Sequence, residues 1–288
     1  MKTPVPSRRP RDDEIDAYGL THIGKVRKEN QDHFLMALIH KRVDLIATSL
    51  SDEQRAQVGG EKRLAGISMV ADGVGGGVGG AEASATALEA AMHYVNNSMA
   101  CYYGADATEA DFIESLQAAA MRAHEAILAK RSAEERSGTM ATTLTLWMGV
   151  WPVAYLLQVG DSRYYLFREG VLRQVSRDQT IAQDLVDEGV MSRTAAFRTQ
   201  FNNVLSSALG AETALPVVTR LTQEWGAVNL SCSDGLTKHL SDAQIAERLR
   251  TMTSSKQVCE QLLQDALDAG GTDNITIVVG RVVPKEPT

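Results

Sequence analysis

The chain has few cysteines, and their positions show no pairing pattern. Three are present among its 288 residues, at Cys101, Cys232 and Cys259. An odd number without paired spacing differs from a disulfide framework and from a thiolate metal site. We therefore expect a reducing compartment and a cytoplasmic protein.

The chain also lacks an excess of basic residues. It carries 29 Lys and Arg against 36 Asp and Glu, which gives a formal net charge of -7. Binding of nucleic acid usually requires a basic face, so the charge balance argues against a nucleic-acid partner. The composition points to no partner subunit, and we expect a monomer.

No stretch of the sequence has the length of a leader or a membrane span. The first 13 residues are rich in Pro and Arg without an apolar run, so we expect no secretory signal and a disordered tail over residues 1–15. The segment from Leu144 to Val159 is nearly all apolar, but it is shorter than the roughly 20 residues that a span needs. It also contains Pro152. We expect two buried strands joined by a turn there, and no contact with a membrane.

The periodicity of apolar residues predicts blocks of strands and pairs of helices. Helices are predicted over residues 81–95, 110–130, 181–188 and 254–269. An opening strand and turn are predicted over residues 18–26, and further strands over residues 34–39, 66–71, 142–148, 153–158, 164–167, 171–175, 227–231 and 275–283. This order favours an α+β fold, in which a β-sandwich carries helices on its outside.

The sequence shows no internal repeat and no linker, so we expect a single domain over residues 16–284. Two segments interrupt the pattern. Residues 47–64 are polar and irregular, which predicts a surface loop or a short helix. Residues 191–207 are also irregular, and we interpret them as a flap whose mobility is a hypothesis.

Four aspartates stand at the ends of hydrophobic, strand-like runs in separate parts of the chain. They are Asp72 in Val70-Ala71-Asp72-Gly73, Asp161 in Val159-Gly160-Asp161-Ser162, Asp234 in Cys232-Ser233-Asp234-Gly235, and Asp273 in Gly271-Thr272-Asp273-Asn274. An ionised carboxylate at the edge of an apolar core is costly to desolvate. Carboxylates that come together also raise one another's pKa.

A divalent cation would resolve both costs. Ligand sets made only of oxygen suit Mg²⁺, Mn²⁺ or Ca²⁺ rather than zinc or copper. The hypothesis is therefore a metal site built from carboxylates, which activates water for hydrolysis. Because a lone Asp-Gly is usually a turn, the hypothesis depends on the repeated pattern and not on any one aspartate.

A glycine-rich stretch after Asp72 offers a different interpretation. Gly75, Gly77 and Gly80 match the GxGxxG pattern of a dinucleotide-binding loop. That loop requires a βαβ unit with an acidic residue at the end of the next strand, and residues 96–103 do not have that form. Glycines also let the backbone pass close to a metal, so that the Gly73 carbonyl could be a ligand beside Asp72.

Catalysis by a serine nucleophile is the other alternative. Ser162, Ser231 and Ser233 lie next to or near aspartates, but the sequence contains no GxSxG elbow. The six histidines show no HExxH or paired spacing. His33, which follows Asp32, is the histidine that we would place near the site.

Six short motifs occur in an order that resembles a known family. They are Arg27-x-x-Asn30-Gln31-Asp32, Asp72-Gly73-Val74-Gly75-Gly76, Gly138-Thr139-x-x-Thr142-Thr143, Gly160-Asp161-Ser162-Arg163, Cys232-Ser233-Asp234-Gly235-Leu236 and Gly271-Thr272-Asp273-Asn274-Ile275-Thr276. Together they resemble the metal-dependent serine/threonine protein phosphatases of the PPM family (type 2C), in its compact bacterial form. The resemblance covers residues 18–283 and implies a four-layer α/β-β/α sandwich of two antiparallel sheets flanked by helix pairs.

The resemblance implies two Mg²⁺ or Mn²⁺ ions, with a possible third. Asp72 would bridge the first two ions. Asp234 and Asp273 would complete the ligand set of the first ion, and the Gly73 carbonyl would help to hold the second ion. Asp161 would form the third site together with Asp234.

The resemblance also implies roles outside the ligand set. Arg27 would bind the substrate phosphate, since the planar guanidinium matches phosphate oxygens bidentately. Asp32 would hold metal-bound water, and Asn274 would lie behind the ligands. With Asp72, the residues Arg27 and Asp32 are the candidate catalytic residues.

Some positions depart from the family pattern. Val74 stands where many eukaryotic members have a histidine proposed as general acid, so the source of the leaving group's proton is not identified. Gln31 stands where others have Glu. Asp178-Gln179-Thr180 replaces the more usual Asp-His-Ser, and the segment 197–203 also differs.

The sequence therefore predicts a metal-dependent hydrolase of phosphoserine and phosphothreonine in proteins, acting through a metal-bridging water. Its partners would be phosphorylated proteins, the products of a serine/threonine kinase. The alternatives are a catalytically weak, phosphatase-like binding module and a hydrolase dedicated to one regulatory protein.

Overall fold

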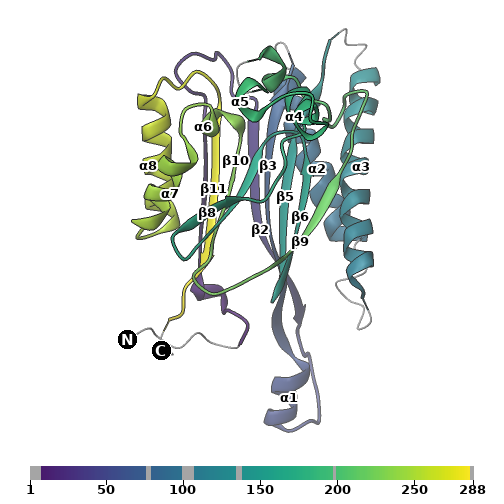
Figure 1. Ribbon diagram of the computed structural model, residues 1–288. Helices are drawn as coiled ribbons and strands as arrows, with labels where there is room; N and C mark the ends of the chain where they lie inside the picture. Colours follow the sequence, from purple (N-terminus) through teal and green to yellow (C-terminus); the bar gives the residue numbers. More distant parts are fainter. Residues whose placement is uncertain (1–7, 76–78, 99–106, 134–137, 197–198, 286–288) are drawn as a thin grey trace.

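Two antiparallel sheets pack face to face between two pairs of helices. The computed structural model describes residues 8–75, 79–98, 107–133, 138–196 and 199–285. In Figure 1, α2 and α3 lie outside one sheet, and α7 and α8 lie outside the other. This is the four-layer α+β sandwich that the sequence predicted, and the prediction is confirmed.

The first sheet has the strand order β1-β11-β10-β7-β8. Its strands are β1 (Ile15–His22), β7 (Arg163–Arg168), β8 (Val171–Gln174), β10 (Val228–Cys232) and β11 (Ile275–Val282). Helices α7 (Asp242–Arg250) and α8 (Ser255–Asp268) cover its outer face. Helix α7 begins with a capping box, since the Ser241 hydroxyl accepts from Gln244 N–H and the Gln244 side chain accepts from Ser241 N–H.

The second sheet has the strand order β2-β3-β5-β6-β9. Its strands are β2 (Asp32–Val43), β3 (Gly60–Val74), β5 (Leu144–Val150), β6 (Val153–Val159) and β9 (Val217–Thr222), and β4 (Ala141–Thr142) pairs with the end of β3. Helices α2 (Gly79–Ser98) and α3 (Glu109–Ala133) cover it. Short elements complete the chain: η1 (Asp12–Glu14), α1 (Asp52–Val58), α4 (Ile181–Asp187), α5 (Arg193–Ala196), η3 (Gln200–Asn203) and α6 (Asp234–Thr237).

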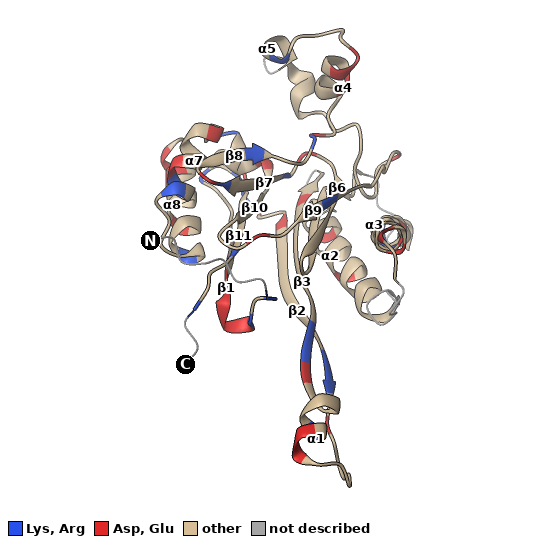
Figure 2. Cartoon of the chain, turned by 60° about the horizontal axis from the view of Figure 1, so that its bottom comes forward, with Lys and Arg blue, Asp and Glu red and all other residues tan. Residues whose placement is uncertain are grey.

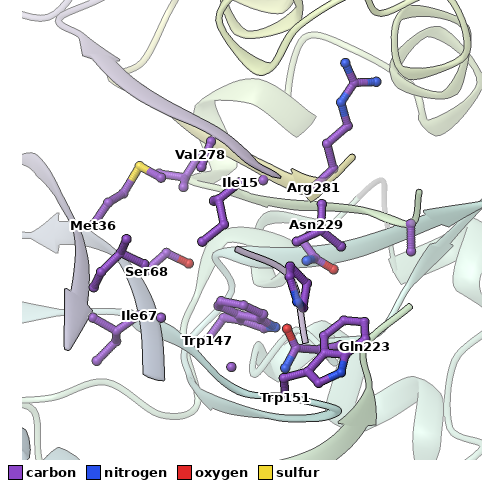
Figure 3. A pocket seen from close by; sticks show the side chains of 18 of the residues that line it. Ile15, Met36, Ile67, Ser68, Trp147, Trp151, Gln223, Asn229, Val278 and Arg281 are labelled. Carbon is purple, nitrogen blue, oxygen red and sulfur yellow. The ribbon is translucent and has the colours of Figure 1, made fainter. Parts of the chain in front are cut away.

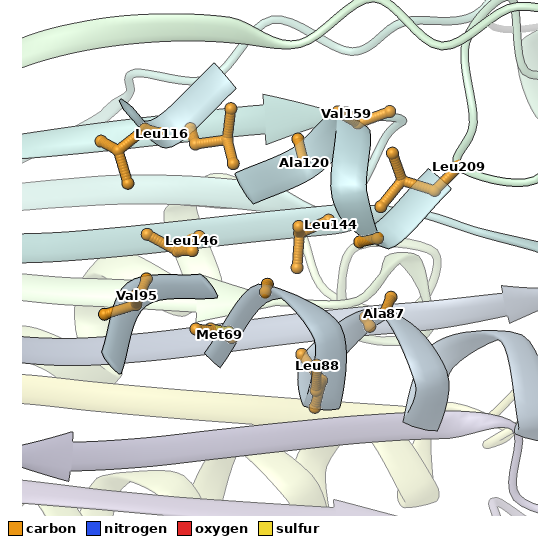
Figure 4. Packing of buried hydrophobic residues seen from close by; sticks show 14 of the residues in the cluster. Met69, Ala87, Leu88, Val95, Leu116, Ala120, Leu144, Leu146, Val159 and Leu209 are labelled. Carbon is orange, nitrogen blue, oxygen red and sulfur yellow. The ribbon is translucent and has the colours of Figure 1, made fainter. Parts of the chain in front are cut away.

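The main hydrophobic core lies between the second sheet and its helices. Figure 4 shows side chains of α2 and α3 facing those of β3, β5 and β6. The predicted apolar face of α3 is buried along its length, at Phe112, Leu116, Ala119, Ala123 and Ile127. Because both helices present small residues such as Ala87 and Ala120 to the sheet, they pack close to it and hold its strand ends in place.

The long hydrophobic segment forms a hairpin of two buried strands, as predicted. Val150 of β5 pairs with Val153 of β6, and Pro152 lies in the turn between them. Among the helices in the described ranges, none combines the length and the hydrophobicity that a membrane crossing requires. Cys232 and Cys259 are buried thiols, whereas Cys101 lies outside the described residues.

The segment 47–64 was predicted as a surface loop or a short helix, and the structure is more regular than that. Strands β2 and β3 continue past a register shift at Ile39/His40 as a charged hairpin that ends with Val43 opposite Gly60. Helix α1 sits at the tip of this hairpin (Figure 1). We call residues 40–63 the arm. Figure 2 shows residues of both charge signs along it.

Other boundaries also differ from the predictions. Strand β9 was not predicted. The strand and turn predicted over residues 18–26 are present, since β1 ends at His22 and a turn follows at residues 24–26. Within the predicted tail 1–15, residues 1–7 lie outside the description, but Arg8 donates to the buried Glu14 and residues 12–14 form η1. The predicted flap 191–207 contains α5 and η3, with residues 197–198 undescribed. The mobility of this segment stays a prediction.

Candidate metal centre

Two aspartates lie side by side at one end of the β2–β3 pair. Asp32, the first residue of β2, is the register partner of Asp72 near the end of β3. Residues directly opposite in an antiparallel pair point to the same face of the sheet. The sheet therefore brings these two carboxyls together, at the end of the hairpin opposite to the arm.

Two more aspartates come from adjacent strands of the other sheet. Asp234 opens α6 just after β10, and Asp273 precedes β11, which pairs with β10. Gly235 lets the two connections touch, since a Cβ at this position would lie 1.9 Å from the Asn274 carbonyl oxygen. A larger residue than glycine there would separate Asp234 from Asp273.

Asp161 follows β6, in a connection that is linked to Asp72 through hydroxyl groups. The backbone N–H of Asp72 donates to Thr143 Oγ1 at 3.0 Å, and Thr143 Oγ1 lies 2.7 Å from Ser162 Oγ. Thr142 Oγ1 donates to the Asp72 carbonyl at 2.8 Å. Thr142 at the end of β4 and Thr143, which lies between β4 and β5, therefore fix the backbone at Asp72 and the residue after Asp161.

The pKa values show that these carboxyls share one electrostatic environment. Burial raises the pKa of Asp72 well above its usual range, and the charges of Asp32, Asp234, Asp161 and Asp273 raise it further. Burial also raises the pKa of Asp32 to about 6 and that of Asp161 to about 7. The centre thus holds more negative charge than the surrounding protein compensates.

The side chain of Asp32 is held firmly but keeps one oxygen unused. Its Oδ2 accepts hydrogen bonds from Ser233 Oγ at 2.6 Å and from Thr276 Oγ1 at 2.8 Å. Its Oδ1 is buried and has no hydrogen-bond partner among the described residues. A buried acceptor without a donor is costly, so this oxygen marks a place for a further donor.

Two cationic side chains face the outer carboxylates. Lys238 Nζ lies 2.5 Å from Asp234 Oδ2 and 2.7 Å from Asp273 Oδ2. Arg27 donates to both oxygens of Asp273, from Nε to Oδ1 at 2.6 Å and from its terminal nitrogen to Oδ2 at 2.9 Å. Burial opposes ionisation of Asp273, but these hydrogen bonds outweigh it and lower its pKa.

The donor set fits a hard divalent cation. The side-chain donors are all oxygen, which Mg²⁺ and Mn²⁺ prefer. A cation would also relieve the raised pKa values of Asp72 and Asp161. Within the described part of the chain, however, no three His, Cys, Asp or Glu residues gather at metal-binding spacing. Lys238 and Arg27 occupy oxygens of Asp234 and Asp273 that would otherwise be open to such a cation.

Two further predicted residues lie at the same end. Gly73 is in close backbone contact, with its N–H donating to the Gln31 carbonyl at 3.1 Å, and a Cβ there would lie 2.3 Å from the Gly80 carbonyl oxygen. Asn274 accepts from Gln31 N–H and donates to the carbonyls of Ile23 and Glu29. Asn274 therefore fastens the loop before Asp32 to the start of β11.

The structure does not support the dinucleotide or serine-nucleophile interpretations. Strand β3 leads into α2, but the next element of the described chain is helix α3, and the pairings of β3 are antiparallel. Ser233 donates to Asp32, while Ser162 contacts a threonine and not a base. His33 contacts Ser84 Oγ at 2.8 Å, and burial lowers its pKa.

Three residues that act on the centre through its aspartates were not predicted from the sequence: Ser233, Lys238 and Thr276. Ser233 and Thr276 were part of the motifs, but nothing in their spacing predicted that both would donate to Asp32. Lys238 was not considered at all. The available signal was its position four residues after Asp234, where side chains on one helix turn meet.

A separate cavity lies between the two sheets, near the base of the arm. It has a volume of about 370 Å³, and Figure 3 shows side chains from both sheets around it. The apolar part of its lining includes Met36, Ile67, Trp147, Trp151 and Val278. Its described lining contains none of the five aspartates of the centre, so the cavity is not part of the candidate metal centre.

Comparison with known proteins identifies a family model and relatives that match this chain. The family model described as protein phosphatase 2C matches residues 48–270. The serine/threonine protein phosphatase PstP of Mycobacterium tuberculosis (strain ATCC 25618 / H37Rv) is 33% identical over 217 residues, which are 75% of this chain and 40% of that protein. The serine/threonine phosphatase stp of Listeria innocua is 29% identical over 215 residues, 74% of this chain and 83% of that protein.

Solved structures agree in fold. The crystal structure of the catalytic domain of PstP in complex with two manganese ions has a TM-score of 0.72 and 29% identity, and the match covers 94% of this chain and 99% of that one. The alignment to full-length PstP spans only 40% of that protein's length.

Proposed function

Since the chain belongs to the protein phosphatase 2C family, we propose that it is a metal-dependent phosphatase of phosphoserine and phosphothreonine in proteins. The observation that carries the proposal is the gathering of five aspartates into one electrostatic centre, in which the pKa values of Asp32, Asp72 and Asp161 are raised. The other two are Asp234 and Asp273. The two manganese ions in the PstP structure support a metal requirement.

We assign the metal ligands by chemistry and position. Asp72, Asp234, Asp273 and the Gly73 carbonyl would hold two Mg²⁺ or Mn²⁺ ions, and Asp161 with Asp234 would hold a third. When bound, such ions lower the pKa of water and neutralise charge on the phosphoryl group. Phosphoester hydrolysis needs this neutralisation more than it needs a protein nucleophile.

Asp32 would orient the attacking water. Its Oδ2 is fixed by Ser233 and Thr276, so the carboxyl cannot rotate without breaking two hydrogen bonds. The unpartnered Oδ1 is then the acceptor for a proton of that water. A carboxyl with a pKa of about 6 is suited to accept a proton near neutral pH.

Arg27 would bind the phosphate of the substrate. Its side chain is 55% exposed, and its fork already holds the carboxylate of Asp273 bidentately. A phosphate offers the same pair of oxygens to the fork, so Arg27 can exchange one partner for the other. Val74 cannot act as a general acid, so the leaving alkoxide would take its proton from water or from another group.

Substrates and location follow from the same chemistry. We propose that the substrates are proteins phosphorylated by a serine/threonine kinase, and that the protein acts as a monomer in the cytoplasm. The alternative is a catalytically weak module that binds phosphoproteins. It is favoured by Gln31 and Val74, which depart from the family pattern.

Phosphate release from a phosphothreonine peptide tests the proposal. We expect release with Mn²⁺, none with excess EDTA, and a loss of at least about 10²-fold in Asp234→Asn. Asp44→Asn on the arm is the matched control, since Asp44 pairs only with the exposed Arg42 among the described residues. Full activity in Asp234→Asn would contradict the metal assignment, and no release by the wild type with Mn²⁺ bound would favour the weak module.

A further inference from the structure

Lys238 ends the turn of helix that begins at Asp234, and its ammonium faces the metal centre. It stands four residues after Asp234, and Nζ bridges Oδ2 of Asp234 and Oδ2 of Asp273 at 2.5 and 2.7 Å. Its charge also reaches Asp161, whose raised pKa it partly offsets. One ammonium therefore interacts with three of the five aspartates.

The ammonium and a metal ion compete for the same oxygens. Metal–oxygen bonds of Mg²⁺ or Ca²⁺ are roughly 2.0–2.6 Å long, so an ion held by Asp234 and Asp273 through these oxygens would lie where Nζ now lies. A protonated lysine has no lone pair and cannot be a ligand itself. Two cations in that space would also repel each other strongly.

The side chain of Lys238 can rotate away from the metal centre. Its side chain is 33% exposed, so Nζ can reach water by rotating its own four-carbon stem. No described backbone segment has to move for that rotation, because Lys238 lies at the C-terminal cap of the short helix α6. The pairing thus stabilises the metal-free centre without closing it.

We propose that Lys238 is a built-in competitor of the metal, which neutralises Asp234 and Asp273 in the metal-free protein and swings out when an ion binds. The inference rests on the proposed metal site. It predicts a protein that stays folded without metal and that binds its ion more weakly than the carboxylates alone would allow. The activity would then follow changes in the free concentration of the ion.

Two other roles for Lys238 predict different results. If the ammonium stayed in place and supported the ligands, its removal would weaken metal binding. If it permanently took the place of the third ion, its removal would add one bound ion and leave the affinity of the others unchanged. The three roles are therefore separated by one titration.

The test is calorimetric titration of Mn²⁺ into EDTA-stripped protein, for the wild type, Lys238→Met and Lys238→Gln. We expect both variants to bind with a Kd lower by roughly tenfold at unchanged stoichiometry. We also expect the melting temperature of the metal-free protein to fall in both. Lys256→Met is the matched control, because Lys256 makes the same i, i+4 pair with Glu260 on α8 and has no contact with the centre among the described residues.

The outcomes separate this inference from the proposed function. An unchanged or higher Kd in both Lys238 variants, or one extra ion at unchanged affinity, would overturn the role of competitor while leaving the phosphatase proposal intact. Failure of all the proteins to bind Mn²⁺ would overturn both. Far-UV circular dichroism of each metal-free variant shows whether it is folded. Two different replacements of Lys238 are used so that a folding defect in one of them does not decide the result.

Discussion

The side chain of Asp32 combines a rigid position with an unsatisfied oxygen. Only 2% of the residue is exposed, and Oδ2 is held by two hydroxyl groups while Oδ1 has no described donor. Such an arrangement costs stability and persists where it serves chemistry. It explains why we assign a proton-accepting role to Asp32 and not to the more exposed groups around it.

Asp32→Asn should impair turnover while leaving metal binding largely intact. The amide keeps an oxygen for Ser233 and Thr276 but cannot accept a proton from water. We expect kcat to fall by about 10²–10⁴-fold, the usual contribution of general acid–base catalysis. Mn²⁺ affinity, measured by titration, should change little. A large loss of affinity with normal kcat at saturating metal would show that Asp32 is a ligand instead.

The raised pKa values predict how the metal-free protein responds to pH. Asp32 and Asp161 have pKa values of about 6 and about 7 when folded, above the unfolded value for Asp of roughly 3.9. The folded state then binds more protons than the unfolded state, so these groups reduce stability as the pH rises from about 4 to 7.

The double variant Asp32→Asn/Asp161→Asn should remove that dependence. In EDTA, the melting temperature of the wild type should fall further between pH 5 and pH 7.5 than that of the double variant. His33, whose pKa burial lowers, is present in both proteins and contributes to both pH profiles. Parallel pH profiles would show that the two carboxyls ionise normally in the fold.

At the scale of elements, the space between the two sheets differs from one end of the sandwich to the other. Near the metal centre Gly19 of β1 lies against Phe34 of β2, and a Cβ on Gly19 would be 2.6 Å from the ring. Toward the arm the sheets diverge and leave the cavity of Figure 3, where Gly66 has room. A Cβ on Gly66 would make ordinary contacts, at 3.5 Å to Leu38 and 3.7 Å to Trp147.

Alanine at these two glycines should therefore have opposite effects. Gly66→Ala adds a methyl group that makes ordinary van der Waals contacts and restricts the unfolded chain, which should stabilise the protein by about 0.4–1 kcal/mol. Gly19→Ala forces Phe34 to shift and should destabilise by about 1–3 kcal/mol. Urea unfolding of the two variants beside the wild type measures both. Equal effects would mean that the sheets are evenly spaced.

The elements that could be predicted are those with a strong apolar pattern. Helix α3 and the hairpin of β5 and β6 were predicted to within a few residues because each buries a continuous apolar face. Strand β9 was missed, since it alternates exposed and half-buried residues at the edge of its sheet and follows Pro216. The arm was missed for a similar reason, as its strands bury little.

The aspartates of the centre were predicted, but their contacts with residues far away in the sequence were not. The aspartates were recognisable because each follows a buried strand with a small neighbour. Which groups would meet them could not be predicted, because Ser233 and Thr276 reach Asp32 from more than 200 residues away. Lys238 resembles any solvated lysine until the fold brings Asp273 beside Asp234.

At the scale of the whole molecule, the metal centre and the arm lie at opposite ends of the β2–β3 hairpin (Figure 1). In the described residues, the hydrogen bonds of the stretch 44–59 stay within the arm, such as those of Ser51 with Gln54 and of Asp44 with Arg42. We therefore expect residues 44–59 of the arm to be dispensable for the shape of the centre.

Replacing residues 44–59 by Asn-Gly should leave peptide hydrolysis unchanged. Val43 and Gly60 are already paired, and Asn-Gly forms the tight turn that suits such a hairpin. We expect kcat/KM for a short phosphothreonine peptide to stay within about twofold, since each twofold change is only a fraction of 1 kcal/mol. A large loss would show that the arm supports the centre through β2 and β3.

The arm also affects how the molecule moves through water. A slender hairpin with a helix at its tip adds little mass to a chain of 31.2 kDa but extends far from the body (Figure 2). Friction depends on reach more than on mass. The chain should therefore sediment more slowly and tumble less evenly than a rounded particle of equal weight, and trimming the arm should bring its frictional ratio closer to that of a sphere.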